Sequence, residues 1–235
     1  MTTLLAHAKL TLSLRVVGVR ADGYHLLDAE MVSLDLADSL TFEAGDGLTV
    51  SGLRPDEVPL GDDNLVRRAL VTVGRSAQVT LAKRIPLGGG LGGGSSNAAA
   101  VLRWAGVDDV GIATKLGADV PFCLHGGRAR VEGTGEVLTP LPFEPRVLTL
   151  LMPPFGCSTP AVYQAWDDLG GPVGAGPNDL EAAALRVEPR LAEWRDKLGE
   201  ATGEVPVLAG SGSTWFVEGE FPGGGRIVTR TVPAY

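Results

Sequence analysis

Alternating apolar and polar positions mark several short segments of this chain as strands with one buried face. These segments are residues 9–17, 29–36, 40–42, 48–53, 79–87, 129–132, 136–138, 147–152 and 214–218. Apolar residues spaced three or four apart instead predict helices at 65–73, 98–104, 110–116, 162–166 and 179–198, the last interrupted near Pro189. Helices and strands mix without a regular βαβ repeat, which predicts an α+β fold in two lobes, residues 1–143 and 144–235.

A glycine-rich segment joins one expected strand directly to an expected helix. Six of the seven residues from Gly88 to Gly94 are glycine, the exception being Leu91, and Ser95 and Ser96 follow. Glycines cost conformational entropy on folding, so a packed domain carries a run of them where the backbone must approach something closely. Backbone N–H groups at the start of a helix bind phosphate, and strand, glycine loop, helix is the order that such a cradle requires. The segment therefore predicts a phosphate-binding loop.

Three other interpretations of this segment fit less well. The dinucleotide fingerprint G-x-G-x-x-G arises automatically in such a run, and here it lies in mid-chain with a proline at the strand exit. The P-loop pattern G-x-x-x-x-G-K-[ST] has Ser95 where it needs lysine, so a cation must come from elsewhere. Lys9, Lys83 and Arg84 are the candidates. A flexible linker is disfavoured because no spacer separates the glycines from the strand and the helix.

Composition narrows the kinds of ligand. The 235 residues are 44% hydrophobic and 20% charged, as in an ordinary folded protein. The formal charge of −8 argues against broad binding to nucleic acid or to an acidic membrane, but a few N–H groups can still hold a nucleotide.

No apolar run approaches the length that spans a bilayer, and residues 1–9 lack the layout of a secretory signal, so a cytoplasmic location is expected. Cys123 and Cys157 have no partners at metal-ligand spacing, so neither a protein metal site nor a disulfide framework is expected.

Two charged residues stand alone in apolar surroundings. Asp119 precedes Val-Pro-Phe, and Lys9 lies between Ala8 and Leu10 on an expected strand. An isolated buried charge is costly, so the two would satisfy each other. A kinase needs a carboxylate for the acceptor hydroxyl and a cation for the transferred group. A helix cap or turn residue at position 119, and an edge-strand charge at position 9, explain the same pattern equally well.

The segment Pro86–Asn97 resembles the phosphate-binding motif of the GHMP kinases, the superfamily of galactokinase, homoserine kinase and mevalonate kinase. Ala8–Leu12, Arg20–His25, Gly117–Phe122 and Gly210–Ser213 resemble the branch that acts on a cytidine-diphosphate derivative of methylerythritol in the non-mevalonate route to isoprenoids. The resemblance implies a two-lobed GHMP fold with the active site in the cleft between the lobes. It also implies ATP-dependent phosphorylation of the 2-hydroxyl of the methylerythritol part, with Mg²⁺ accompanying ATP.

By position, the resemblance implies roles for single residues. Lys9 and Asp119 match the catalytic pair. The residues implied to contact ATP are Pro86, Leu87, Gly88, Gly89, Gly90, Leu91, Gly92, Gly93, Gly94, Ser95, Ser96, Asn64 and Lys83. Those implied to contact the substrate are Tyr24, His25, Thr11 and Tyr163. Thr11 stands where the family usually carries an asparagine, and the chain is shorter than usual near residues 74–78 and 104–110.

Other functions remain open. A homoserine or mevalonate kinase is disfavoured by Tyr24 and His25, since a small acyclic alcohol has no nucleobase for these two side chains to bind. A non-catalytic ligand sensor on the same fold is disfavoured by the presence of both Lys9 and Asp119. A dinucleotide-dependent oxidoreductase is the weakest alternative. A small molecule is the expected partner, and the sequence predicts no oligomeric state.

Overall fold

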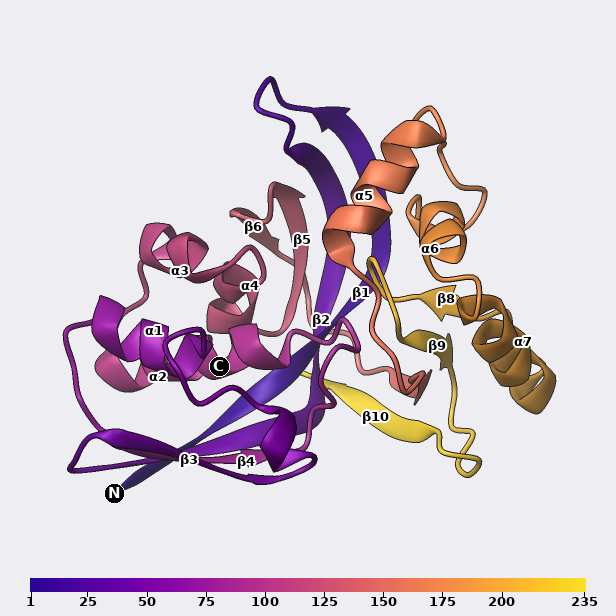
Figure 1. The fold of residues 1–235 in the computed structure, drawn as a ribbon. Helices are drawn as coiled ribbons and strands as arrows, with labels where there is room; N and C mark the ends of the chain where they lie inside the picture. The colour runs from indigo at the N-terminus through magenta and orange to yellow at the C-terminus, as the bar shows by residue number, and fades with distance from the viewer.

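Two very long antiparallel strands, β1 (Thr2–Val19) and β2 (His25–Glu43), form the backbone of the molecule. The computed structural model describes all 235 residues (Figure 1). The strands are joined by an Asp-Gly turn, in which Gly23 has a φ of +87° and Arg20 N–H donates to the Tyr24 carbonyl. Sequence reasoning divides β2 into two pieces at residues 29–36 and 40–42, whereas the structure shows one continuous strand.

The ten strands form one connected sheet. The remaining strands are β3 (Gly47–Gly52), β4 (Gln78–Lys83), β5 (Arg128–Gly133), β6 (Val137–Pro140), β7 (Val147–Leu151), β8 (Val207–Leu208), β9 (Trp215–Glu218) and β10 (Ile227–Val232). The main path runs β3-β4-β2-β10-β7-β9-β8, with β1 and β5 also paired to β2, and β6 paired to β5.

Strand β10 connects the two parts of the sheet. It pairs antiparallel with β2, where Thr231 lies opposite Leu34, and with β7, where Ile227 lies opposite Leu150. Sequence reasoning places no strand after residue 218, and that expectation is wrong. The last strand therefore closes the C-terminal part of the chain onto the N-terminal hairpin. The division at residues 143 and 144 stays a prediction.

The helices lie on opposite sides of the β1–β2 pair in Figure 1. On one side are α1 (Leu65–Thr72), α2 (Gly93–Ala105), α3 (Val110–Leu116) and α4 (Val120–His125), with a short 3₁₀ turn, η1 (Pro55–Glu57). On the other side are α5 (Thr159–Asp168), α6 (Glu181–Val187) and α7 (Leu191–Thr202). No helix is long and apolar enough to cross a bilayer.

Two helical expectations need correction. Helix α4 is not predicted by the apolar pattern, because its six residues are too few to show a period. Helix α2 begins at Gly93, five residues before the expected start at Ala98, since glycines and serines score poorly as helix formers. The expected interruption near Pro189 is confirmed, because it separates α6 from α7.

A small apolar cluster joins the two halves beneath the glycine segment. It contains Leu10 and Leu34 from the long hairpin, Leu91 from the glycine segment, and Leu150 and Phe216 from the C-terminal strands. The larger core cluster holds the buried faces of the helices against the sheet. Any shift of the C-terminal strands would disturb the small cluster, so packing couples the glycine segment to both halves.

Asn178 anchors a second glycine-containing turn, Gly210–Ser213. Its Nδ2 donates to the carbonyl oxygens of Leu208 (2.8 Å) and Gly210 (2.7 Å), and its Oδ1 accepts from Leu180 N–H at 2.9 Å. The side chain is buried, so water cannot replace these bonds. Sequence reasoning did not single out this residue.

Replacing Asn178 with alanine should lower the free energy of unfolding by about 3 kcal/mol, because two carbonyls and one N–H would be left buried without partners. Urea unfolding of both proteins measures the difference. Gln164→Ala is the control, since its amide bonds only to the exposed Asp168 carboxylate and its loss should change stability by less than about 0.5 kcal/mol. Equal stability of the Asn178 variant and the native protein would contradict the anchoring role.

Candidate active site

The glycine loop leaves β4 at Lys83 and enters α2 at Gly93. Gly90 and Gly92 have φ values of +74° and +66°, a region that other residues rarely adopt. Gly90 also approaches the second glycine turn, because a Cβ there would lie 2.5 Å from the Gly212 carbonyl oxygen. At these two positions, glycine is required by the path of the backbone.

The start of α2 is uncapped. Gly92 occupies the N-cap position without a side chain, and the first helical bond runs from Ser96 N–H to the Gly92 carbonyl at 2.8 Å. The N–H groups of Gly93, Gly94 and Ser95 have no acceptor in the protein. Three free N–H groups at the positive end of a helix form a site that favours an anion such as phosphate.

The two serines at this helix start have different surroundings. The Ser96 hydroxyl is buried and donates to the His7 carbonyl at 2.6 Å, with the Cys123 Sγ also within hydrogen-bonding distance at 3.3 Å. Ser95 is half-buried and its hydroxyl has no protein partner. Of the two hydroxyls, only that of Ser95 is left for a ligand.

Leu91, the single non-glycine in the run, holds the loop in place. Its side chain is buried in the small apolar cluster. Its carbonyl accepts a hydrogen bond of 3.0 Å from the Lys9 N–H on β1. The loop is therefore attached to the strand that carries the expected catalytic lysine.

Lys9 and Asp119 form an ion pair, with Nζ and Oδ2 3.3 Å apart. The Lys9 side chain is buried, while that of Asp119 is 34% exposed. Asp119 occupies the N-cap position of α4, but its carboxylate makes no capping bond, so the alternative of a helix cap does not account for it. The Lys9 side chain is only 8% exposed, so the alternative of a solvent-facing charge on an edge strand does not account for it. The structure thus brings the two residues together as the sequence predicts.

Two irregularities in the pairing of β1 with β2 affect the direction of the Lys9 side chain. The register with β2 shifts between His7 and Lys9 and again between Thr11 and Ser13. Such bulges turn side chains away from strict alternation, and four consecutive residues, 8–11, are buried. Thr11 Oγ1 lies 3.3 Å from Lys9 Nζ and accepts a hydrogen bond from it. Thr11 therefore orients the lysine from within the same strand.

Tyr163 lies between this pair and the expected base-binding residues. Burial raises the pKa of its phenol, and the negative charge of Asp119 raises it further. The His25 ring packs against the Tyr163 ring with centroids 4.7 Å apart. Tyr24, by contrast, is 61% exposed and contacts neither ring, with Arg20 over its face at 5.2 Å.

Asp167 is a site residue that sequence reasoning missed. Its Oδ1 lies 2.9 Å from His25 Nε2 and fixes the orientation of the imidazole. It follows Tyr163 by four residues on α5, so both project from one helix face toward the hairpin. This four-residue spacing from Tyr163 was the only feature of the sequence that could have indicated Asp167 as a site residue.

Asn64 and Lys83, both expected near ATP, have protein partners. Asn64 caps α1, since its Oδ1 accepts from Val66 N–H at 2.8 Å. The Lys83 ammonium is buried against Asp38. Their roles toward a nucleotide stay predictions.

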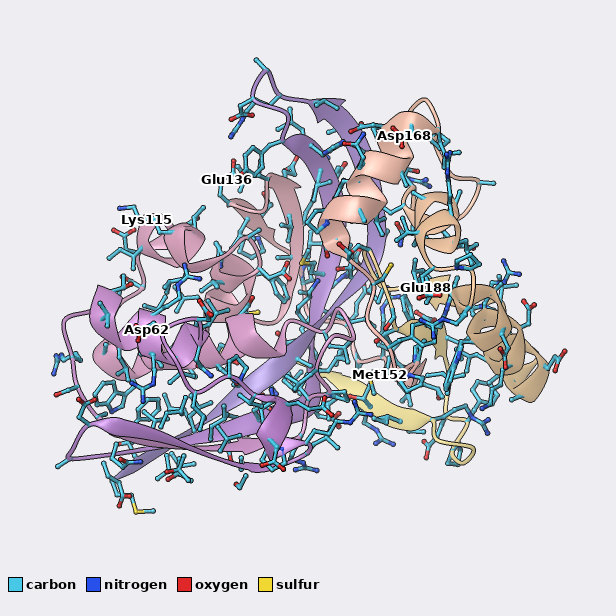
Figure 2. The ribbon with its side chains drawn as sticks, in the orientation of Figure 1. Asp62, Lys115, Glu136, Met152, Asp168 and Glu188 are labelled. Atoms are coloured by element: carbon cyan, nitrogen blue, oxygen red, sulfur yellow. The ribbon has the colours of Figure 1, made fainter.

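The second glycine turn, Gly210–Ser213, packs directly against the loop. Next to it, the Thr214 hydroxyl donates to the Gly89 carbonyl at 2.5 Å. Met152, labelled in Figure 2 near the middle of the molecule, supports the same glycine, since its Sδ would lie 3.4 Å from a Cβ there. Residues from the C-terminal half thus hold the loop from one side while β1 holds it from the other.

A hollow of about 600 Å³ lies elsewhere, between the segment 172–179 and α7. Neither Lys9 nor Asp119 nor any residue of the glycine loop lines it. We place the site at the loop, because the free N–H groups of α2 and the Lys9–Asp119 ion pair lie there and not in the hollow.

Comparison with known proteins identifies relatives of this chain. Residues 64–127 match the family model described as the GHMP kinases N terminal domain, and this range includes the glycine loop and Asp119. A 4-diphosphocytidyl-2-C-methyl-D-erythritol kinase of Cereibacter sphaeroides is 38% identical over 92% of this chain and 88% of its own length. One from Paracoccus denitrificans is 40% identical over 90% and 84%.

Solved structures give the same result. A crystal structure of 4-(cytidine 5'-diphospho)-2C-methyl-D-erythritol kinase matches with a TM-score of 0.79 and 34% identity, covering 98% of this chain and 99% of that one. A mevalonate kinase from L. major matches with a TM-score of 0.67 at 12% identity, covering 99% and 96% of the two chains, which shows a common fold only.

Gly92→Ala should lower turnover about tenfold or more. A Cβ at this position would lie 2.6 Å from Lys9 Cγ, and alanine is strained at this φ. Steady-state kinetics would measure the loss. Gly106→Ala, at the far end of α2, is the matched control: its φ is also positive but its Cβ would meet nothing within 4 Å, so only stability should fall. Equal turnover losses in both variants would contradict a specific contact with Lys9.

The two cysteines should differ in reactivity. Burial raises the pKa of the Cys123 thiol to about 12, with a smaller contribution from the Asp119 charge, and the hydrogen bond from Ser96 opposes both. At pH 8 the thiol is therefore protonated as well as inaccessible. Iodoacetamide should modify the half-buried Cys157 at least about tenfold faster, as read by peptide mass. The difference should vanish in urea, and equal rates in the native protein would contradict the burial of Cys123.

Proposed function

The chain belongs to the 4-diphosphocytidyl-2-C-methyl-D-erythritol kinases, within the GHMP kinase superfamily, and we propose that Lys9, Asp119 and the glycine loop carry out the phosphoryl transfer of that family. It is a kinase of the non-mevalonate route to isoprenoid precursors, and it uses ATP. The observation that supports the residue assignment is the Lys9–Asp119 pair beside the uncapped start of α2.

The triphosphate of ATP lies against the start of α2 in this proposal. The N–H groups of Gly93, Gly94 and Ser95, together with the Ser95 hydroxyl, bind its oxygens. Pro86 to Gly92 shape the wall of the site, and Ser96 supports it from the core side. Asn64 lies at the start of α1 on the same side of the sheet, where the nucleoside is expected.

Mg²⁺ is proposed to enter with ATP. No group of three or more His, Cys, Asp or Glu side chains is arranged to hold a metal ion in this protein. That agrees with the ordinary behaviour of Mg²⁺, which keeps several waters and binds through nucleotide phosphates and one or two protein oxygens. The Ser95 hydroxyl and the Asp119 carboxylate would hold the ion, which would supply charge neutralisation on the transferred phosphoryl group.

Asp119 and Lys9 act on the acceptor. Asp119 takes the proton of the substrate 2-hydroxyl while the hydroxyl oxygen forms a bond to the γ-phosphorus of ATP. The bond from that phosphorus to the β,γ-bridging oxygen breaks at the same time, and ADP leaves. Lys9 orients the carboxylate and offsets the negative charge that develops on the transferred group. Thr11, bonded to Lys9, sets the position of the ammonium.

The cytidine end of the substrate is proposed to bind on the other side of Asp119. The packed rings of Tyr163 and His25 provide an aromatic surface there, and Asp167 holds the imidazole. Tyr24, exposed at the hairpin turn, is free to cover the ring from outside. The proposed cleft lies between residues 1–143 and 144–235, since α5 carries Tyr163 and the hairpin carries His25.

Release of ADP from the full chain with 4-diphosphocytidyl-2-C-methyl-D-erythritol, ATP and Mg²⁺ tests the proposal. Homoserine and mevalonate serve as comparison substrates, because kinases with those names share the fold. Turnover with either of these and none with the cytidylyl substrate would overturn the substrate assignment. ATP binding without any turnover would favour a ligand sensor.

Asp119→Asn should lower kcat by a factor of about 10² to 10⁴ and leave the affinity for ATP nearly unchanged, because the lost group acts mainly in the transition state. Steady-state kinetics and calorimetric ATP binding separate the two effects. Asp109→Asn is the matched control, since asparagine can also cap α3 and the residue lies outside the site. Parallel losses of kcat and ATP affinity in the Asp119 variant would indicate a structural role instead.

A further inference from the structure

A single guanidinium near the end of α2 connects the two elements that carry the reacting pair. Arg103 Nη2 donates to the Leu5 carbonyl at 2.9 Å, four residues before Lys9 on β1. Its Nη1 donates to the Cys123 carbonyl at 2.8 Å, four residues after Asp119, the N-cap of α4. Arg103 therefore bonds the strand of the lysine and the helix of the aspartate to the same side chain.

On the side of α4, this bond reaches Asp119 through one further hydrogen bond. Cys123 N–H donates to the Asp119 carbonyl at 3.0 Å, so the two main-chain segments move together. The helix has only six residues, and the Asp119 carboxylate makes no capping bond within it. A helix this short has little stability of its own, so the direction of the carboxylate depends on what holds the whole helix in place. Arg103 provides one of those bonds.

On the side of β1, the bond lies next to an irregular part of the strand. The register with β2 shifts between His7 and Lys9. His7 N–H donates to the Tyr235 hydroxyl at 3.3 Å, and the His7 carbonyl accepts from the Ser96 hydroxyl at 2.6 Å. Alternate residues of a strand direct their N–H and C=O groups to the same edge. Together with the Arg103 bond, three main-chain groups on this edge are thus held from outside the sheet immediately before the lysine.

The Tyr235 ring holds the guanidinium in place. Arg103 Cζ lies over this ring, 3.5 Å from its centroid, as in a cation–π contact. Ala234 forms an isolated β-bridge with Gly126, just after α4, which places the ring beside that helix. A Cβ at Gly126 would lie 2.9 Å from the ring, so glycine is needed for this approach. The face of the guanidinium is covered while its edge donates to the two carbonyls.

A purely stabilising role accounts for only part of this arrangement. A positive charge in the last turn of a helix complements the dipole wherever the side chain points. Here the guanidinium instead donates to main-chain carbonyls of two other elements, which its planar fork of donors permits and a lysine ammonium does not reproduce. The elements that it joins are the two that must keep the reacting groups in register. A misplacement of about 1 Å in such groups can lower a rate about 100-fold.

We propose that Arg103 is a positioning residue for phosphoryl transfer, which sets the separation of Lys9 and Asp119 from the far end of α2. It touches neither ATP nor the phosphate acceptor. Because α2 begins at the glycine loop, the same helix places the phosphates at its start and the reacting pair through its last turn. The inference rests on the proposed function for the roles of Lys9 and Asp119.

Arg103→Met keeps an apolar stem of similar length and removes both bonds. We expect kcat to fall about tenfold, because the reacting pair loses its fixed separation. The KM for the cytidylyl substrate and the calorimetric dissociation constant for MgATP should each change less than about twofold, because Arg103 touches neither ligand. A native kcat would overturn the proposal, as would equal losses in kcat, KM and MgATP affinity, which indicate general damage to the fold.

Arg226→Met is the matched control. Arg226 also donates to two main-chain carbonyls, those of Phe221 (2.8 Å) and Pro222 (3.0 Å), but it lies between β9 and β10. Its loss should lower stability and leave kcat within about twofold of the native value. A loss of kcat equal to that of Arg103→Met would overturn the proposal, because any arginine that bonds to the main chain would then have the same effect.

A double-variant cycle shows whether Arg103 acts through Asp119. In the Asp119→Asn background, adding Arg103→Met should lower kcat by less than about twofold, because the carboxylate whose place it sets is already gone. A further tenfold loss in that background would overturn the proposal, since the two residues would then act independently.

Tyr235→Leu keeps the proposal testable if Arg103→Met fails to fold. The residue is 54% exposed, so the substitution leaves the core intact. It removes the ring over the guanidinium and the acceptor of His7 N–H, and kcat should fall about threefold at unchanged MgATP affinity. An unchanged kcat in this variant would overturn the proposal.

A measurement without turnover separates this inference from the proposed function. With isotopically labelled lysine, the side-chain NMR signal of Lys9 should differ between the native protein and Arg103→Met, because its contact with Asp119 changes. The signal of the exposed Lys197 should stay in place. An unchanged Lys9 signal would overturn the inference. A shifted Lys9 signal, with no ADP release by the native protein, would contradict the proposed function and leave the control of the pair by Arg103 standing.

Discussion

The hydrogen bond from the Lys9 N–H to the Leu91 carbonyl is the contact on which the site depends. It joins the strand that carries Lys9, the proposed catalytic lysine, to the proposed phosphate-binding loop. Leu91 makes the attachment rigid, because its side chain is buried in the apolar cluster shared by both halves. Without this anchor, the surrounding glycines would be held only from the side of Thr214, and the loop would sample more conformations.

The site concentrates positive potential in a protein of net charge −8. Two lysines, the free N–H groups of α2 and its dipole all lie at one end of one helix. Each lysine is paired with a carboxylate, so the unbalanced positive potential comes from the free N–H groups and the dipole of α2. Local geometry, rather than overall charge, thus decides where an anion binds.

The two halves of the chain contribute differently. The N-terminal half provides the proposed phosphate-binding loop and the Lys9–Asp119 pair, while the C-terminal half holds the loop from the side of Gly210–Ser213 and adds Tyr163 and Asp167. Strand β10 keeps the two halves in one sheet by pairing with both β2 and β7. The distance between the reacting groups and the base-binding residues is therefore set by the sheet.

The sequence by itself determined the local features: most of the short strands and helices, the glycine loop, and the two isolated charges. Each depends on residues close together in the chain, whose backbone preferences act within a few residues. Only the tertiary structure decided which isolated charges meet. Lys9 and Asp119 are far apart in sequence, as are Lys83 and Asp38, and strand β10 is placed by pairing with partners that no local pattern reveals. It also decided that the Ser96 hydroxyl faces the core and that Asp167 holds His25, because such contacts depend on how the helices pack against the hairpin.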